Sequence, residues 1–435
     1  MPSINAVKIT IGKETTPGVA VPTTAVIPIK GPGSLDRKVE RTTDPVIIGT
    51  GMAAGEYPVS ASVGGDLPLT PRACAGFGQL LKGALGEEAA PAQIVGIIRI
   101  KYSGVSASCK LALDATAKTI SSLIGTAGSE SLDATFGTAG VVDLDTIATD
   151  TVGEIVSLID GYANYDCKLI AGASGSTATG LHVLAGTTES KQAKNRWAVI
   201  ILLGAASGAY AHRMTADLDI ATERPTFTIQ NDGWQDNYQR DGISVKNLNL
   251  SAALKGLVEG TVSLIGMKEA GGQSASVLAM PSAQPFMFAE GITSFGGYDY
   301  EYCRSVSAVM ENNSLEDGYS QASMDRAYHQ KGMFDLTGDL TVRLDSVSIL
   351  ERARAALPSS LQSVLLVFKG KTIGMSVSEM LILEIPYATV STFEFAENNG
   401  VFDAKVAWKG LNPPDTGNYD PPIVATLITV DATEY

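Results

Sequence analysis

The sequence predicts a mainly β (α+β) protein with two tandem β-sandwich or β-barrel domains and a small inserted α/β domain. Three observations predict this class. Short apolar runs alternate with polar residues and end at Gly, Pro, Asn or Asp, as β-strands do. The order and spacing of these runs repeat in the two halves of the chain. Hydrophobic residues make up 45% of 435 residues, which is enough to bury more than one core.

The first β domain begins with two strand-like segments around a long loop. Residues 34–41, "SLDRKVER", and residues 59–70, "VSASVGGDLPLT", have the alternation of strands, and residues 42–59 join them. The apolar spacing of residues 75–86, "AGFGQLLKGALG", predicts a short amphipathic helix that ends at Gly86. Further strands are expected at residues 226–229, 243–250 and 258–267, with a turn at Lys255-Gly256.

The C-terminal third repeats this plan. Residues 305–340 read as strand, long loop and strand, and they end in Gly-Asp-Leu as the first pair of strands does. Ser34 precedes Leu67 by 33 residues, and Ser307 precedes Leu340 by the same 33. The elements expected next are a flanking helix at residues 348–357 and strands at 363–370, 380–395 and 400–410. We expect an internal duplication, with chance agreement as the alternative, because the identity between the halves is low.

A segment rich in Ala, Gly, Ser and Thr interrupts the first β domain. Within it, Thr151 and Glu154 fit a capping box at the start of a short amphipathic helix that Gly161 ends, and residues 165–172 read as a strand. This pattern favours an α/β decoration domain on the outside of the fold. The expected domains are residues 1–93 with 206–275, the insertion 94–205, the second β domain 276–411, and a proline-rich linker with a last strand at 412–435.

Charge and apolar patterning exclude several classes of protein. The net charge of −14 argues against tight nucleic-acid binding, which needs clustered Lys and Arg, although an acidic surface could let DNA pass without holding it. The longest apolar run, residues 197–206, is too short to span a bilayer, and the first ten residues lack a signal-peptide pattern. The cysteines show no C-x-x-C spacing, so we expect buried free thiols and no zinc site.

The stretch "VIIGTGMAAG", residues 46–55, invites a dinucleotide-binding interpretation. That fingerprint needs a helix directly after the glycines, and Gly55 and Pro58 prevent one. Asp66 stands near the spacing of a ribose-binding carboxylate, but it follows Gly64-Gly65 in an expected loop. The sequence therefore predicts a glycine-rich loop and no cofactor.

Signatures of catalysis and of metal binding are also missing. His182, His212 and His329 are isolated in sequence, so packed or surface histidines are expected. No G-x-S-x-G, H-E-x-x-H or P-loop motif occurs. The acids of residues 311–317 lack the spacing of a calcium loop. We therefore predict no enzyme activity, no catalytic residues and no metal ligands.

Three segments together resemble the major tail tube proteins of long-tailed, non-contractile bacteriophages. They are "KETTPGVAVPTTAVIPIKGPGSLDRKVERT", "GGDLPLTPRACAGFGQLLKGALG" and "GISVKNLNLSAALKGLVEGTVSLIGMKE". The resemblance rests on the E-T-T-P-G-V-A-V-P start, the G-D-L strand before a short helix and the paired strands that end in G-x-K-E. It implies tail-tube domains, each with a flanking helix, that join edge to edge into rings and stack into a tube.

The resemblance also implies partners and a location. Besides other copies of the chain, the expected partners are tape-measure, tail-tip and tail-terminator proteins. Double-stranded DNA would pass through the tube without tight binding, and no membrane-spanning segment is expected. The protein would be found in the virion tail, and in the host cytoplasm during assembly.

Contact residues between subunits or rings are expected in two loops. The long loop after the first strand typically reaches a neighbour in this family, and residues 312–331 form its counterpart in the second half. The candidate residues are Arg41, Asp44, Ile47, Gly49, Gly51, Met52, Glu56, Tyr57, Glu311, Asn313, Glu316, Asp317 and Tyr319.

Two tube domains in one chain change the expected stoichiometry. A ring of six domains would need three chains, so we expect a pseudo-sixfold trimer. Three chains at −14 each give −42, and this charge would repel DNA if much of it faced the lumen. The candidate lumen strands lie within residues 243–267 and 381–408.

Two other functions stay open at this point. The Ala/Gly/Ser/Thr-rich insertion would also suit a carbohydrate- or cell-surface-binding virion decoration protein. A hydrolase with an unrecognised site is the third hypothesis.

Overall fold

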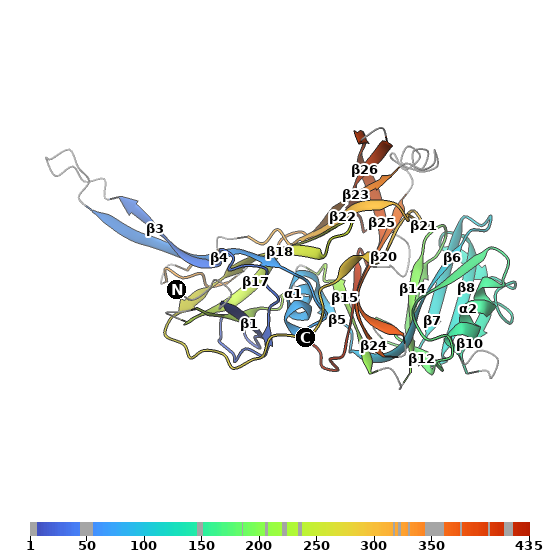
Figure 1. Ribbon diagram of the computed structural model, residues 1–435, viewed down its shortest axis with the longest axis horizontal. Helices are drawn as coiled ribbons and strands as arrows, with labels where there is room; N and C mark the ends of the chain where they lie inside the picture. The colour runs from blue at the N-terminus through green and yellow to red at the C-terminus, as the bar shows by residue number, and fades with distance from the viewer. Residues whose placement is uncertain are drawn as a thin grey trace.

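The structure is a computed structural model of the protein. It describes residues 7–43, 55–145, 151–184, 186–204, 208–219, 224–233, 237–315, 318–320, 323–328, 331–343, 361–374, 376–398, 401–412 and 421–435. The fold is mainly β, as the sequence predicts, and the paired strands of the described ranges run antiparallel. A long two-stranded arm projects from one end of the molecule, and the inserted residues lie at the other end (Figure 1).

The first half contains the strands and the helix that the sequence predicts. Its elements are β1 (Lys8–Lys13), β2 (Ala25–Val26), β3 (Asp36–Thr43), β4 (Glu56–Leu69), α1 (Ala75–Leu85), β5 (Gly86–Glu88), β15 (Ala209–Ala216), β16 (Phe227–Asp232), β17 (Asn237–Ala253), β18 (Val258–Gly266) and β19 (Lys268–Ala270). Strands β17 and β18 form the predicted hairpin, with Lys255 at φ 64° in its turn. The expectation of a loop at Asp66 was wrong, because this residue pairs with Ser263 inside the long strand β4.

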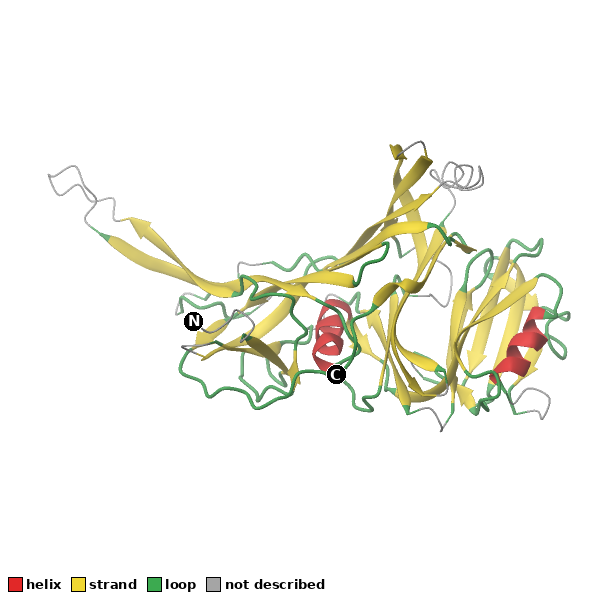
Figure 2. Ribbon diagram, viewed as in Figure 1, coloured by secondary structure: helices red, strands yellow, loops and turns green. Residues whose placement is uncertain are grey.

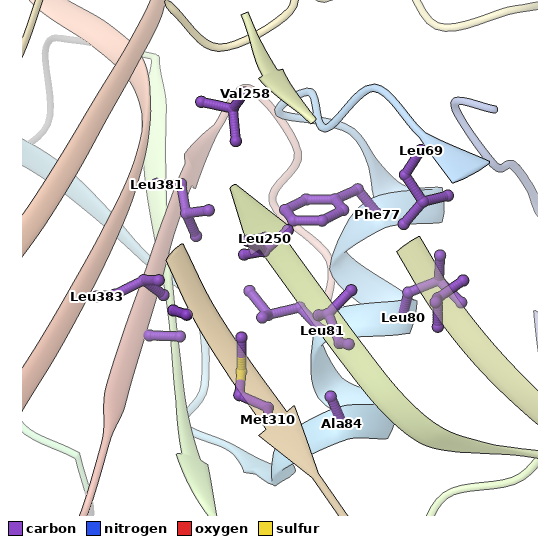
Figure 3. Packing of buried hydrophobic residues seen from close by; sticks show 14 of the residues in the cluster. Leu69, Phe77, Leu80, Leu81, Ala84, Leu250, Val258, Met310, Leu381 and Leu383 are labelled. Carbon is purple, nitrogen blue, oxygen red and sulfur yellow. The ribbon is translucent and has the colours of Figure 1, made fainter. Parts of the chain in front are cut away.

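Helix α1 is buried between the sheets rather than lying on their surface (Figures 2 and 3). Its small residues allow this, since a Cβ at Gly76 would collide with the Val26 carbonyl and one at Gly78 with the Tyr435 ring. The helix ends at Gly86, whose φ of 110° suits glycine, as predicted. Leu81 packs in the same cluster as Met310 of the second half, so the two halves share a core.

The second half consists of long strands. They are β20 (Met287–Phe295), β21 (Tyr298–Asp299), β22 (Cys303–Glu311), β23 (Asp335–Arg343), β24 (Gln362–Gly374), β25 (Val377–Asn398), β26 (Val401–Gly410) and β27 (Val424–Thr429). The strands predicted at residues 305–340 and 363–410 are confirmed. The helix expected at residues 348–357 lies outside the described residues.

The insertion forms a compact module of antiparallel sheets with one helix among its described residues. Its elements are β6 (Ala92–Tyr102), β7 (Ser108–Asp114), β8 (Thr119–Thr126), β9 (Ser129–Leu132), β10 (Val141–Asp143), α2 (Val152–Asp160), β11 (Tyr165–Gly172), β12 (Gly180–Leu181), β13 (Thr188–Gln192) and β14 (Ala198–Leu203). The predicted capping box is present, because Thr151 and Glu154 each accept a hydrogen bond from the other's backbone N–H. Because the pairing is antiparallel, the arrangement is α+β in the strict sense.

One face of this module packs against the second half. Trp197 and Val199 of the module are buried in one cluster with Leu365, Val367 and Ile382 of strands β24 and β25. The opposite side of the module has its own core, around Phe136 and Ile155. The module therefore shares an apolar contact with the β domains in addition to having a core of its own.

The Gly-Asp-Leu segments of the two halves make the same contacts with a serine. The Asp66 N–H donates to Ser34 Oγ at 2.9 Å, and the Asp339 N–H donates to Ser307 Oγ at 3.0 Å. A Cβ on the preceding glycine would collide in each case with the carbonyl oxygen of that serine. Each residue in these contacts has its counterpart 273 positions later: Ser34 and Ser307, Gly65 and Gly338, and Asp66 and Asp339.

Candidate assembly interface

The sheets of the two halves are joined by one strand pair, which we call the seam. Strand β17 pairs with β22 from Asn247 opposite Glu311 to Ala253 opposite Ser305. On its other edge β17 pairs with β18, and β22 pairs with β23, so the strands run continuously from one half into the other. The seam therefore joins two strand edges, one from each half, that would otherwise be open.

Side chains at the seam alternate between the core and the opposite face. Leu248 and Leu250 of β17 are 0% and 1% exposed, and they face Met310 and Ala308 of β22, which are equally buried. Asn249, between the leucines, and Ser251, directly after them, are exposed on the other face. The seam thus has one apolar face and one polar face, as expected for a sheet that covers a core on one side.

The loop after β22 fastens the second half to the first. The buried Asn312 side chain donates to the Val245 carbonyl at 2.8 Å, and its backbone N–H donates to the Lys246 carbonyl at 2.8 Å. Farther along this loop, Asp325 pairs with Arg37 at 2.9 Å. Arg326, 2% exposed, donates to the Gly266 carbonyl. The loop contributes polar contacts that specify where the halves meet.

Two strand edges at opposite ends of this continuous sheet remain uncovered by the described residues. Strand β3 pairs there with β4, and residues 390–398 of β25 pair with β26. Figure 1 shows β3 on the projecting arm and the β25–β26 hairpin on the other side of the molecule. Exposed apolar side chains accompany both edges, with Val39 42%, Tyr57 57% and Val59 52% exposed on the arm, and Phe395 48% and Phe402 55% exposed on the hairpin.

The structure places six of the candidate contact residues. Arg41, Glu56 and Tyr57 lie on the arm and are exposed. Glu311, Asn313 and Tyr319 lie at and beyond the end of β22, where Glu311 pairs with Asn247. The other candidates, Asp44, Ile47, Gly49, Gly51, Met52, Glu316 and Asp317, lie outside the described residues.

Several residues at this interface were missed by sequence reasoning. Asn312 and Arg326 are buried polar residues whose partners lie far away in sequence, so no local pattern marks them. Phe393 and Phe395 do carry a signal, because "TFEF" places two aromatic residues on one face of a strand. Their rings contact each other with centroids 4.8 Å apart. That Phe395 stays half exposed is seen only in the folded chain.

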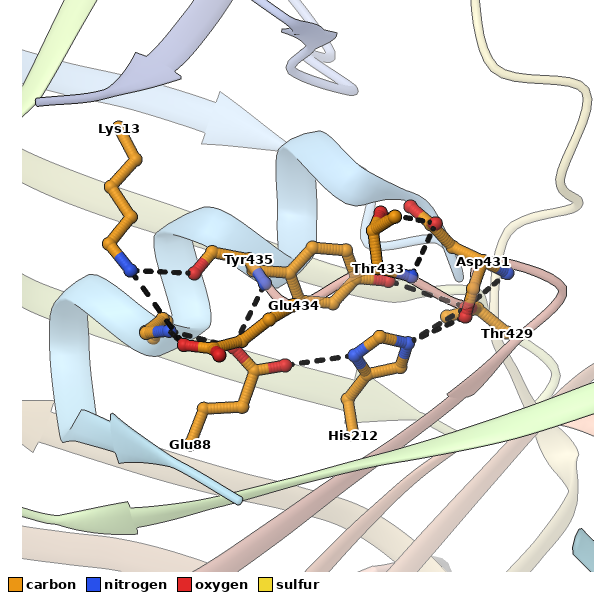
Figure 4. A network of polar contacts seen from close by, with 9 residues as sticks. Lys13, Glu88, His212, Thr429, Asp431, Thr433, Glu434 and Tyr435 are labelled. Atoms are coloured by element: carbon orange, nitrogen blue, oxygen red, sulfur yellow. Dashed lines mark hydrogen bonds and ion pairs between the residues drawn. The ribbon is translucent and has the colours of Figure 1, made fainter. Parts of the chain in front are cut away.

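The histidines are packed into structural networks where the structure describes them. His212 is fully buried, and its Nδ1 and Nε2 lie 2.9 Å from Glu88 Oε1 and from the Asp431 carbonyl (Figure 4). Tyr435 stacks on the imidazole, with ring centroids 4.2 Å apart. Lys82 bridges Glu88 and Glu434 at 2.9 and 2.6 Å. These contacts hold the last residues of the sequence against α1, and they use both ring nitrogens.

All four cysteines are free thiols, as predicted. Burial raises the pKa of Cys74 and Cys109 to about 11, and that of Cys167 and Cys303 to about 12. They are therefore protonated and poorly reactive at neutral pH. Among the described residues, no three His, Cys, Asp or Glu side chains form a group that could hold a metal ion. Neither described helix is long and apolar enough to cross a membrane.

Within the described residues, the chain combines a core shared by both halves, an internal strand seam, and two strand edges that no other described strand covers. The family model described as "Phage tail tube protein" matches residues 4–373, which is most of the chain. The chain therefore belongs to the phage tail tube protein family, and it is a structural component of a bacteriophage tail. No curated protein matches the sequence.

Proposed function

We propose that three copies of this chain form a ring with pseudo-sixfold symmetry, and that such rings stack into the tube of a long, non-contractile tail. The internal seam is the observation that carries this proposal. It joins two sheets edge to edge inside one chain, and it leaves an edge at each end of the joined sheet for another copy. A head-to-tail contact of this kind generates a closed ring when its rotation closes.

The repeated contacts support an internal duplication. The Gly-Asp-Leu segments agree in their hydrogen bonds, as described above, and the β-bulges agree as well. The register of β17 against β18 shifts between Val245 and Asn247, and that of β25 against β26 shifts between Val390 and Thr392. A bulge at the same place in two hairpins is expected if both descend from one domain, since bulges are inherited features of a fold.

The polar face of the continuous sheet is our candidate for the lumen. It includes parts of the strands within residues 243–267 and 381–408 that the sequence favoured. Its acidic side chains include those of Asp36, Asp66, Glu259, Glu311, Asp335, Asp339 and Glu394. Lys405 and Lys409 share this face and offset part of its negative charge. The remaining carboxylates would repel phosphate, so double-stranded DNA would pass without being held. Tape-measure, tail-tip and tail-terminator proteins are the proposed further partners.

Electron microscopy of the purified protein, with class averages of end-on particles, tests this proposal. Hollow rings with three copies per layer are the expected result. Rings with six copies of the chain would contradict the three-chain stoichiometry, and a protein that stayed monomeric at high concentration, even with its tail partners, would contradict ring assembly altogether.

A further inference from the structure

The seam inside the chain provides a template for the contact between chains. We infer that the start of β3 and the two residues before it (residues 34–38) of one copy pair antiparallel with residues 392–396 of β25 in the next copy, with Asp36 opposite Glu394 and Leu35 opposite Phe395. This inference rests on the proposed ring, and it adds the partner strand, the register and the residues that face each other.

The first step is the equivalence between β3 and β22. Asp36 pairs with Gly64 in the first half, and Val309 pairs with Thr337 in the second. Both pairs fit the offset of 273 residues that relates Ser34 to Ser307 and Asp66 to Asp339. Strand β3 therefore occupies in the first half the place that β22 occupies in the second.

The second step is the equivalence between β17 and β25. Gly65 faces Leu264 of β18, and Gly338 faces Trp408 of β26, so these two positions correspond. Across the two hairpins, Leu248 pairs with Val262, and Phe393 pairs with Val406. The equivalent of Leu250 is therefore Phe395, and the equivalent of Asn249 is Glu394.

The third step transfers the seam. Inside the chain Asn249 faces Val309, and Leu250 faces Ala308. Replacing each residue by its equivalent places Glu394 opposite Asp36 and Phe395 opposite Leu35 of another copy. Both edges are open to such pairing, because β3 and residues 392–396 each pair on one side alone within the described residues.

Side-chain burial agrees with this transfer. Leu250 is 1% exposed beneath the seam, whereas Phe395 at the equivalent position is 48% exposed. Val258 and its equivalent Phe402 show the same contrast, at 0% and 55%. Large apolar side chains that remain exposed at core positions mark a surface that a partner covers. A second copy would supply Leu35 beside Phe395 and extend the apolar face.

The contact between chains differs from the internal seam in charge. Asp36 and Glu394 would face each other on the polar face, where the internal seam has Val309 and Asn249. Like charges directly opposite each other weaken a strand pair. Lys405 lies opposite Glu394 on β26, and Lys38 follows Asp36 on the same face of β3, so these cations offset part of the repulsion. Because the internal seam has no like charges at these positions, we expect the contact between chains to be weaker than the seam at low salt.

Cysteine cross-linking in assembled particles tests the register. Residues directly opposite on antiparallel strands have Cα atoms about 4.5–5.5 Å apart, which suits a disulfide. The variant Asp36→Cys with Glu394→Cys removes the like charges and places both thiols on exposed strands. Assembled under oxidising conditions, it should run as covalent dimers and trimers on a non-reducing gel and as single chains after reduction.

Two control variants define the result. Lys38→Cys with Glu394→Cys keeps the same face but shifts the register by two residues, so its yield of cross-linked chains should be several-fold lower. Val309→Cys with Asn249→Cys should form a disulfide within one chain and give no larger species. The native thiols are deterred from reacting by their burial and raised pKa.

The outcomes separate this inference from the proposed function. Rings seen by electron microscopy together with register-specific trimers support both. Rings of the double variant that yield single chains, or cross-linking that is equal in the shifted control, overturn the register and leave the tube function standing. Absence of rings in the wild-type protein, with absence of cross-linked chains, overturns the proposed function and this inference with it.

Discussion

Strands β17 and β25 have related positions in the two halves, and their surroundings differ. Strand β17 is flanked by β18 and β22, and its leucines are buried. The corresponding part of β25 is flanked by β26 on one side in the described structure, and Phe395 there is half exposed. Both strands place two large apolar residues on one face, Leu248 and Leu250 in β17 and Phe393 and Phe395 in β25. The comparison teaches that an apolar pattern predicts a strand face that becomes buried. The pattern does not say whether the residues that bury it belong to the same chain or to another copy.

The described residues beside the equivalent strands β3 and β22 differ in the same sense. The described part of the loop after β22 lies against the first half through Asn312 and Arg326. The arm formed by β3 and β4 instead projects from the body with exposed Val39 and Tyr57 (Figure 1). Contacts that the second half makes within the chain are therefore the contacts that the first half is expected to make with a neighbour.

The largest effect is expected from a charge placed at the two equivalent positions. Leu250→Lys should prevent folding, because it buries an unpaired charge in the shared core. Phe395→Lys should leave the free energy of unfolding of the single chain within about 1 kcal/mol of wild type and abolish ring assembly. Urea unfolding measures the first property, and sedimentation with electron microscopy measures the second.

A lysine at a fully exposed position provides the control for this comparison. Val105→Lys, on the insertion, should affect neither folding nor assembly, since this residue is exposed. Normal rings from Phe395→Lys would remove β25 from the interface between chains and break the comparison.

A second prediction concerns the insertion, which interrupts the first half in sequence and packs against strands β24 and β25 of the second half. Trp197 is 4% exposed at this contact, and the Arg99 guanidinium lies 4.3 Å from its ring centroid. Trp197→Ala should lower the free energy of unfolding by about 3–5 kcal/mol. Leu132→Ala, at a half-exposed position of the same module, should cost far less. Equal effects in urea unfolding would show that the second half does not depend on this contact.

A third prediction concerns the charges between the insertion and β15. Burial, followed by the charge of Arg213, lowers the pKa of His182 to about 4. Burial opposes ionisation of Glu189, but Arg213 and Lys191 hold its pKa at about 2. Arg213 joins the two residues, since it donates to the His182 carbonyl at 2.8 Å and forms two bonds with Glu189 at 2.7 and 2.8 Å.

The sign of the pH effect follows from the direction of these shifts. Between pH 6.5 and 4 the unfolded chain protonates His182 and the folded chain does not, so stability falls as the pH falls. The loss through this group amounts to about 3 kcal/mol by pH 4, and the loss through Glu189 follows between about pH 4.5 and 2. Urea unfolding at pH 7 and pH 4 should give a smaller difference for His182→Gln than for wild type. An equal difference would contradict the assignment.

Sequence reasoning predicted the elements of this fold better than their assembly. The glycine end of α1, the capping box of Thr151 and Glu154, and the β17–β18 hairpin depend on neighbouring residues, and all three were predicted. The seam was not predicted in detail, because periodicity does not say which strand lies beside which. The packing of Trp197 against β24 and β25 was missed for the same physical reason. In the sequence, the strands on both sides of that contact have the same kind of apolar pattern as the other strands, so nothing marks them as partners.

The smallest expected effect distinguishes the two neighbouring asparagines of the loop after β22. Asn312 is fully buried, and its amide satisfies the Val245 carbonyl beside the bulge of β17. Asn312→Ala should therefore cost about 1–3 kcal/mol, since the carbonyl would lose its partner in a buried site. Asn313 is exposed and donates to the Met333 carbonyl within its own loop, so Asn313→Ala should cost less. If both variants unfolded at the same urea concentration as wild type, the loop would not help to hold the halves together. The closed seam and the open edges would then differ in strand pairing alone.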